Sequence, residues 1–230
     1  GQELVRVNYS RGHAVAVPRN LLQNTGSRYY VRDTLRLPDG GVFVSPLDLN
    51  IEQGEIEQPF KPVIRLGTPV FGKGGNLRGM VILNYLAENL LGRLKAISVT
   101  ALGDVMLLND RGYWLLSPRA EDEWGFMLKE GKGIHFRARF PGEWDIIEKQ
   151  SSGQILTEQG LFTFATLYPL KKISDNWESD TSENTVFSPN QRNDGYQWKL
   201  LYFVPPQVLG QYSARLTERL TKVGSFLLIL

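Results

Sequence analysis

Short apolar runs in the first half of the chain predict a small antiparallel sheet. Residues 41–46 follow an Asp-Gly-Gly turn signal, and the apolar runs 63–70 and 80–85 come next. Short β-branched and aromatic runs bounded by Gly and Pro are typical of strands. The glycines of residues 72–76 supply the positive φ values that a hairpin between the last two runs needs. Leucines that recur on one face of residues 86–94 predict a short linking helix.

The second half of the chain repeats this order. We expect a strand at 104–109, a turn, and a strand at 113–116. Residues 124–144 are predicted to form mixed helix and loop that cover one sheet face. Apolar strands at 161–170 and 198–206 follow, and the last one leads into a C-terminal helix. The repeat predicts two similar α+β modules in series.

Other segments have weaker patterns. A strand is expected at 4–7, and a helix, alone or after a loop, within 21–35. The acidic, Pro-bounded residues 47–62 are predicted to cross the first module as an irregular loop. Residues 173–193 are polar and lack periodicity, which predicts a solvated or partly disordered loop.

The C-terminal helix predicted at 209–230 has one apolar stripe. Its positions are Leu209, Tyr212, Leu216, Leu220 and Val223. Such a stripe can meet its copy in a homodimer or pack against the chain's own domain. Residues 223–230 are apolar to the last position, which suits either the first turns of a membrane span or a buried terminal helix. We interpret them as the start of a membrane span, and the strand-like first residues as a start inside a longer protein.

Composition excludes several functional classes. The chain has 230 residues, 42% hydrophobic, and a net charge of +2, so it can bury two modest cores but lacks the basic character of nucleic-acid-binding proteins. It has no cysteine, which excludes disulfides and thiolate metal sites but leaves the redox compartment undetermined. The only histidines, His13 and His135, are in different modules. A metal site or a histidine-based triad is therefore not expected.

No motif predicts a catalytic centre or a cofactor site. Residues 67–74 resemble a phosphate-binding loop, but Gly74 stands where a Ser or Thr must reach magnesium, and Pro69 removes a backbone donor. The sequence has neither a G-x-S-x-G elbow nor an H-E-x-x-H helix. The carboxylates of residues 52–57 and 121–123 have no recognisable catalytic partner, and solvated loop charge explains them better.

An arginine within an apolar strand marks a candidate binding site. Arg65 interrupts the run 63–66, and an inward-facing guanidinium needs a counter-charge or a hydrogen-bond acceptor. That partner is either a ligand, or Asp48 or Glu57 of the acidic segment, which would make a structural ion pair. A second polar cluster at residues 28–32 adds two arginines and two tyrosines.

Aromatic residues are numerous in the second module. They could line a pocket for an apolar or aromatic ligand, but core packing is the simpler explanation. The set consists of Tyr113, Trp114, Trp124, Phe126, Trp144, Phe162, Phe164, Tyr168 and Trp198.

The order of these motifs resembles the double Cache sensor family, the extracytoplasmic domains of bacterial histidine kinases, diguanylate cyclases and chemoreceptors. The segments that resemble its membrane-distal half are 28–30, 41–50, 62–70 and 79–85. The segments that resemble its membrane-proximal half are 109–115, 122–127 and 160–164.

The resemblance implies two tandem PAS-like modules, each an α+β unit with an antiparallel sheet flanked by helices. The distal module is at 1–94, the proximal module at 95–208, and a signalling helix at 209–230 enters the membrane. It also implies that the family's long N-terminal helix and first distal strand precede Gly1. In this family, ligand usually binds the distal module. Carried over to this sequence, the resemblance implies five pocket candidates: Tyr30, Arg32, Ser45, Asp48 and Arg65. Asp33 and Thr34 follow Arg32 where the amino-acid-binding version has tryptophan, so the motif does not support an amino acid ligand.

The leading hypothesis is a noncatalytic periplasmic sensor of a receptor in the bacterial inner membrane. A small anionic or zwitterionic metabolite would bridge Arg32 or Arg65 and the tyrosines, and its binding would shift the C-terminal helix. The rival hypothesis is a module that docks a periplasmic partner protein and has no small-molecule pocket. An exposed apolar patch on one sheet face would favour that rival.

Overall fold

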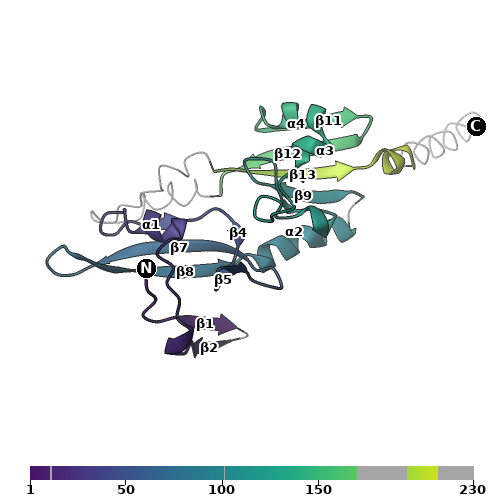
Figure 1. Ribbon diagram of the computed structural model, residues 1–230. Coiled ribbons are helices and arrows are strands. Elements are labelled where there is room, and N and C mark those ends of the chain that lie inside the picture. The colour runs from purple at the N-terminus through teal and green to yellow at the C-terminus, as the bar shows by residue number, and fades with distance from the viewer. Residues whose placement is uncertain (11, 101, 170–195, 212–230) are drawn as a thin grey trace, which may run out of the picture. The chain divides into compact units, whose positions relative to one another are not determined.

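The computed structural model describes residues 1–10, 12–100, 102–169 and 196–211 (Figure 1). These residues divide into two compact units. The first unit contains Gly1–Ala87 and Tyr196, and the second contains Glu88–Pro169 and residues 197–211. Each unit has its own antiparallel sheet flanked by helices, as the resemblance to the double Cache family implies.

The long strand β7 (Pro62–Phe71) is the centre of the first sheet. It pairs with β8 (Leu77–Leu86) on one side, and with the short strands β3 (Phe43–Val44) and β4 (Asp48–Leu49) on the other, always antiparallel. Helix α1 (Tyr29–Thr34) packs on β7 and β3. Alternate residues of β7 are buried, which places Arg65 among the inward-facing positions.

Two small hairpins complete the first unit. Strands β1 (Val7–Ser10) and β2 (His13–Ala16) form one, and β5 (Ile51–Glu52) and β6 (Glu55–Ile56) form the other. A short 3-10 helix, η1 (Arg19–Leu21), follows the first hairpin.

These hairpins correct two sequence-based predictions. The strand expected at 4–7 begins only at Val7. Residues 47–62, predicted as an irregular loop, contain β4, β5 and β6. The second hairpin turns through Gln53 and Gly54, which both have positive φ, and this turn signal was not used in the prediction. The hairpin predicted at 72–76 is confirmed between β7 and β8.

The second unit begins with helix α2 (Glu88–Thr100), which continues beyond the predicted end at 94. Its five-stranded sheet has the order β10-β9-β13-β12-β11, and all pairs are antiparallel. The strands are β9 (Asp104–Leu108), β10 (Trp114–Leu116), β11 (Ser152–Thr157), β12 (Gly160–Leu167) and β13 (Trp198–Val204). Between β10 and β11 lie η2 (Ala120–Asp122), α3 (Phe136–Arg139) and α4 (Pro141–Ile147).

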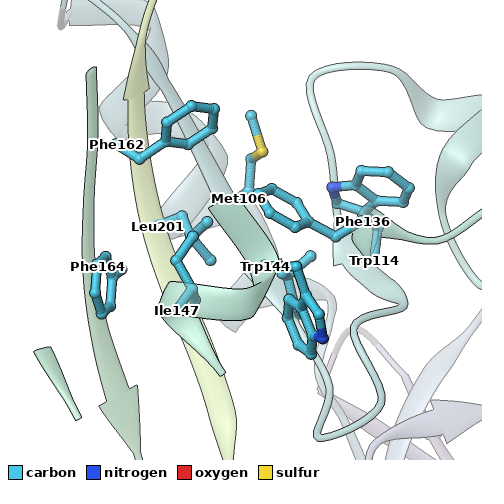
Figure 2. Packing of buried hydrophobic residues seen from close by; sticks show 9 residues of the cluster. Met106, Trp114, Phe136, Trp144, Ile147, Phe162, Phe164 and Leu201 are labelled. Atoms are coloured by element: carbon cyan, nitrogen blue, oxygen red, sulfur yellow. The ribbon is translucent and has the colours of Figure 1, made fainter. Parts of the chain in front are cut away.

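The core of the second unit lies between one sheet face and the α3–α4 pair. Figure 2 shows aromatic side chains from both layers gathered around Met106. Trp114, Phe136 and Phe162 are at most 1% exposed. Burial of each such side chain stabilises the fold by roughly 1.5–3 kcal/mol. Most of the second module's aromatics therefore pack in its core, whereas Tyr168 is exposed.

Several sequence-based predictions concern residues outside the described part of the chain. The polar loop at 173–193 and the stripe from Tyr212 onward belong to this group. Residues 206–211 are helical and include Leu209, the first stripe position. Within the described ranges, every helix is too short or too polar to cross a bilayer.

Candidate functional site

Arg65 forms a buried ion pair with Asp48 in the first unit. Arg65 is only 3% exposed on β7, and its Nη1 donates to Oδ1 of Asp48 on β4. Its Nη2 donates to Oδ1 of Asn50 at 3.3 Å. Of the two structural partners considered from the sequence, Asp48 is therefore the correct one. Glu57 instead pairs with Lys61.

Two tyrosines at the start of α1 enclose this pair. The hydroxyl of Tyr29 donates to Asp48 Oδ2 at 2.7 Å. The ring of Tyr30 lies 4.7 Å from the Arg65 guanidinium carbon, within the range of a cation–π contact. The two rings meet edge to face, with centroids 5.7 Å apart. Helix α1 therefore presents one phenol to the carboxylate and one ring to the cation.

Ser45 holds the backbone next to Arg65. Its Oγ accepts from the Arg65 N–H at 2.8 Å and donates to the Pro46 carbonyl at 2.8 Å. The Ser45 N–H donates to the Arg65 carbonyl at 2.8 Å. Since the hydroxyl acts both as acceptor and as donor in these bonds, Ser45 positions the strand that carries Arg65.

The five predicted site residues do not all meet. Tyr30, Ser45, Asp48 and Arg65 gather in one cluster, whereas Arg32 is exposed on α1 and makes no side-chain hydrogen bond or ion pair with the described residues. The prediction missed two members of the cluster. Tyr29 was part of the motif but not of the predicted site, and Asn50 had no sequence signal that distinguished it.

Burial sets the electrostatics of the cluster. Burial raises the pKa of Asp48 above its ordinary value, although Arg65 and Tyr29 act in the opposite direction. Burial alone would lower the pKa of Arg65, but the Asp48 carboxylate outweighs it and raises that pKa. Burial, followed by the neighbouring carboxylate, raises the pKa of Tyr29. The Tyr29 phenol therefore stays protonated at neutral pH and acts as a donor.

The cluster can bind but has no nucleophile–base pair. It offers a guanidinium, two phenols and an amide, which are groups that recognise carboxylates and other polar ligands. Among the described residues, no group of three His, Asp or Glu side chains is arranged so that it could hold a metal ion.

Comparisons with known proteins agree with this architecture. The sequence matches the family model "Bacterial histidine kinase, sensor domain" over residues 1–174. A search of curated proteins found no match.

Three solved structures have a similar fold and are distant in sequence. The extracellular domain of vpHK1S-Z8, described as a histidine kinase, is 18% identical with a TM-score of 0.72, over 93% of this chain and 67% of that chain. A domain of a sensory box/GGDEF family protein from Vibrio parahaemolyticus is 18% identical with a TM-score of 0.71, over 91% and 70% of the two chains. The ligand-binding domain of Mlp24 with asparagine is 13% identical with a TM-score of 0.50, over 89% and 68%.

These neighbours share the α+β, PAS-like Cache sensor fold, which the sequence resemblance predicted. The family is one of sensor domains rather than enzymes, and such domains lie outside the cytoplasm in membrane receptors. The chain thus belongs to the sensor domains of bacterial histidine kinases.

Proposed function

We propose that this chain senses a small anionic or zwitterionic metabolite in its first module, residues 1–94. In this proposal it is the periplasmic region of a receptor in the bacterial inner membrane. The second module, residues 95–208, and the helix at 209–230 pass the signal to the membrane, with the stripe of that helix available for a homodimer. Ligand binding would act by favouring one of two packings of this helix.

The Arg65 cluster is the observation that carries this proposal. An arginine in a sheet interior is unfavourable unless its charge is compensated. In this cluster a single carboxylate, that of Asp48, compensates the charge of Arg65. Arg65 and Asp48 use only part of their hydrogen-bonding capacity on each other and on Tyr29 and Asn50. The half-buried Tyr30 makes no hydroxyl hydrogen bond with described residues, so it is a free polar group beside a cation. Mlp24, a fold neighbour, was solved with the zwitterion asparagine.

A thermal-shift screen with one conservative variant tests the proposal. The panel consists of organic acids, amino acids, amines, nucleobases and sugars. A ligand should raise the melting temperature in proportion to the logarithm of its concentration. Tyr30→Phe keeps the ring over Arg65 but removes the hydroxyl, and should weaken binding about tenfold if that hydroxyl bonds a charged ligand group.

Tyr9→Phe is the matched control, because Tyr9 is an exposed tyrosine of the same unit on β1. It should leave ligand affinity unchanged. Equal affinity in wild type and Tyr30→Phe would remove Tyr30 from the site. If no compound of the panel changed the melting temperature of the folded protein, small-molecule sensing by this module would be contradicted.

One observation favours docking of a periplasmic partner as a second candidate. On β8, Val81, Leu83 and Tyr85 occupy alternate positions and are 59%, 62% and 52% exposed. Alternate residues share one sheet face, so they form an apolar stripe of the kind that marks protein interfaces. A periplasmic protein that binds wild type but not Leu83→Lys would support this function.

A further inference from the structure

A cavity in the second unit is separate from the Arg65 cluster. Its volume is about 240 Å³, and it opens beside the aromatic core between the sheet and the α3–α4 pair. Its apolar walls are Met106, Trp114, Phe140 and Phe203, and Figure 2 shows the first two among the core side chains. Its polar boundary consists of Asp104, Ser117, Arg119 and Arg139, together with Pro118.

Asp122 forms an ion pair with both arginines at this boundary, and the shorter contacts are those with Arg139. Both terminal nitrogens of Arg139 donate to the Asp122 carboxylate at 2.6 Å, in a two-pronged pair. The Arg139 guanidinium carbon lies 4.7 Å from the Trp114 ring centre. Burial alone would raise the pKa of Asp122, but Arg139 outweighs it and lowers that pKa. Arg139 is thus a preorganised cation above an aromatic wall.

The other arginine has donors to spare. The Nε of Arg119 donates to Glu121 at 3.0 Å and lies 3.5 Å from Oδ2 of Asp122, but its two terminal nitrogens make no hydrogen bond with the described residues. The indole Nε1 of Trp114 is also buried without a hydrogen-bond partner in the described part of the chain. A buried donor without a partner is unfavourable, so an acceptor supplied from outside would be stabilising at this position.

We propose that this cavity binds a small monocarboxylate with an apolar body, such as a short branched or aromatic acid. The carboxylate would accept from Arg119 and from the Trp114 indole, and the apolar body would contact Met106, Phe140 and Phe203. Since a water molecule occupies about 30 Å³ of liquid, the cavity has room for a single ring or a short branched chain. The lining of the proposed cavity includes one carboxylate, that of Asp104. Asp104 also lines a neighbouring cavity, and Lys95 supplies a positive charge there.

Isothermal titration of the whole chain with phenylacetate and with 4-methylpentanoate tests this site. Phenylacetamide keeps the shape without the charge, and phenylalanine adds an ammonium group. The two acids should bind with one-to-one stoichiometry and at least tenfold more tightly than the amide. In a ¹⁵N–¹H spectrum, the acids should shift one indole N–H resonance, because Trp114 gains an acceptor.

Arg119→Gln should weaken binding of the acids at least tenfold. Arg119 is 59% exposed, so this variant should fold normally. The matched control is Arg137→Gln, since Arg137 is a similarly exposed arginine, paired with Asp145, that does not line the cavity. Tyr30→Phe should leave binding of the acids unchanged, which separates this site from the one proposed in the first module.

Three results would overturn the proposal. The first is absence of binding by both acids. The second is binding of phenylacetamide or phenylalanine as tight as that of phenylacetate, since the site would then not select a monocarboxylate. The third is equal affinity of the acids for wild type and Arg119→Gln.

Discussion

At the scale of single residues, the Arg65–Asp48 pair links stability to pH. Arg65→Met should destabilise the fold by about 3–5 kcal/mol at pH 7, because it leaves the Asp48 carboxylate buried and unpaired. Loss of Arg65 raises the folded-state pKa of Asp48 further above its ordinary value of 3.8. The folded variant then binds more protons than the unfolded chain, so its stability is lost as pH rises through the folded pKa. The loss in free energy of unfolding caused by Arg65→Met should therefore be smaller at pH 4 than at pH 7.

Urea unfolding of wild type and variant at both pH values measures this difference. Arg78→Met is the matched control, because Arg78 is exposed on the neighbouring strand β8. It should change the free energy of unfolding little at either pH. If Arg65→Met lowered the free energy of unfolding equally at both pH values, Asp48 would not be the source of the destabilisation.

The sequence could identify Arg65 but not its partner. A charge within an apolar run predicts a buried site, because such a residue is unfavourable on a sheet interior without compensation. Asp48 and Glu57 were equally acceptable from the sequence. The choice depends on the register of β4 on β7, where Asp48 faces Val63, two positions from Arg65. Tyr29 and Asn50 were missed for the same reason, since their hydrogen bonds depend on tertiary contacts.

At the scale of elements, the close approach of α1 to β7 requires a glycine. A Cβ at Gly67 would lie 2.2 Å from Thr34 Oγ1 and 2.7 Å from Ile82 Cδ1. Gly67→Ala should therefore destabilise the fold by roughly 1–3 kcal/mol, because the side chains of Thr34 and Ile82 must shift to make room for the new Cβ. Thr34→Ala in the same chain should restore part of this loss, since it removes the nearest atom, a buried hydroxyl that has no partner among the described residues. Chemical unfolding of the two single variants and the double variant gives the coupling energy.

Gly79→Ala on β8 is the control for this pair. A Cβ at Gly79 has no atom within 4 Å, so the substitution should be close to neutral. If the cost of Gly67→Ala were the same with and without Thr34, the contact between α1 and β7 would not explain the glycine.

Elements with strong apolar runs were predictable, and short polar elements were not. Strands β7, β8, β9, β12 and β13 follow the predicted runs closely, because each contains an apolar run, even though most of β8 is exposed. Strand β11 was missed, since alternate residues of Ser152–Thr157 are exposed and its composition resembles that of a loop. The β5–β6 hairpin has two residues a strand, too few for a periodic signal.

At the scale of the whole molecule, the proposed sensor must convert binding into a shift between two receptor states. A ligand shifts such an equilibrium only by its difference in affinity for the two states. If Tyr30 contacts ligand equally in both states, Tyr30→Phe should lower both affinities by one factor. The midpoint of the dose–response curve of the intact receptor should then move by the factor measured for the isolated domain, about tenfold. Its maximal response should not change.

Autophosphorylation of the membrane-embedded receptor, measured against ligand concentration, tests this expectation. Tyr9→Phe should reproduce the wild-type curve, which excludes a general effect of removing a tyrosine hydroxyl from the first unit. A reduced maximal response with an unchanged midpoint would mean that Tyr30 distinguishes the two states instead of only holding the ligand. The hydroxyl would then contribute to the coupling free energy between the sensor site and the output, and not to uniform affinity.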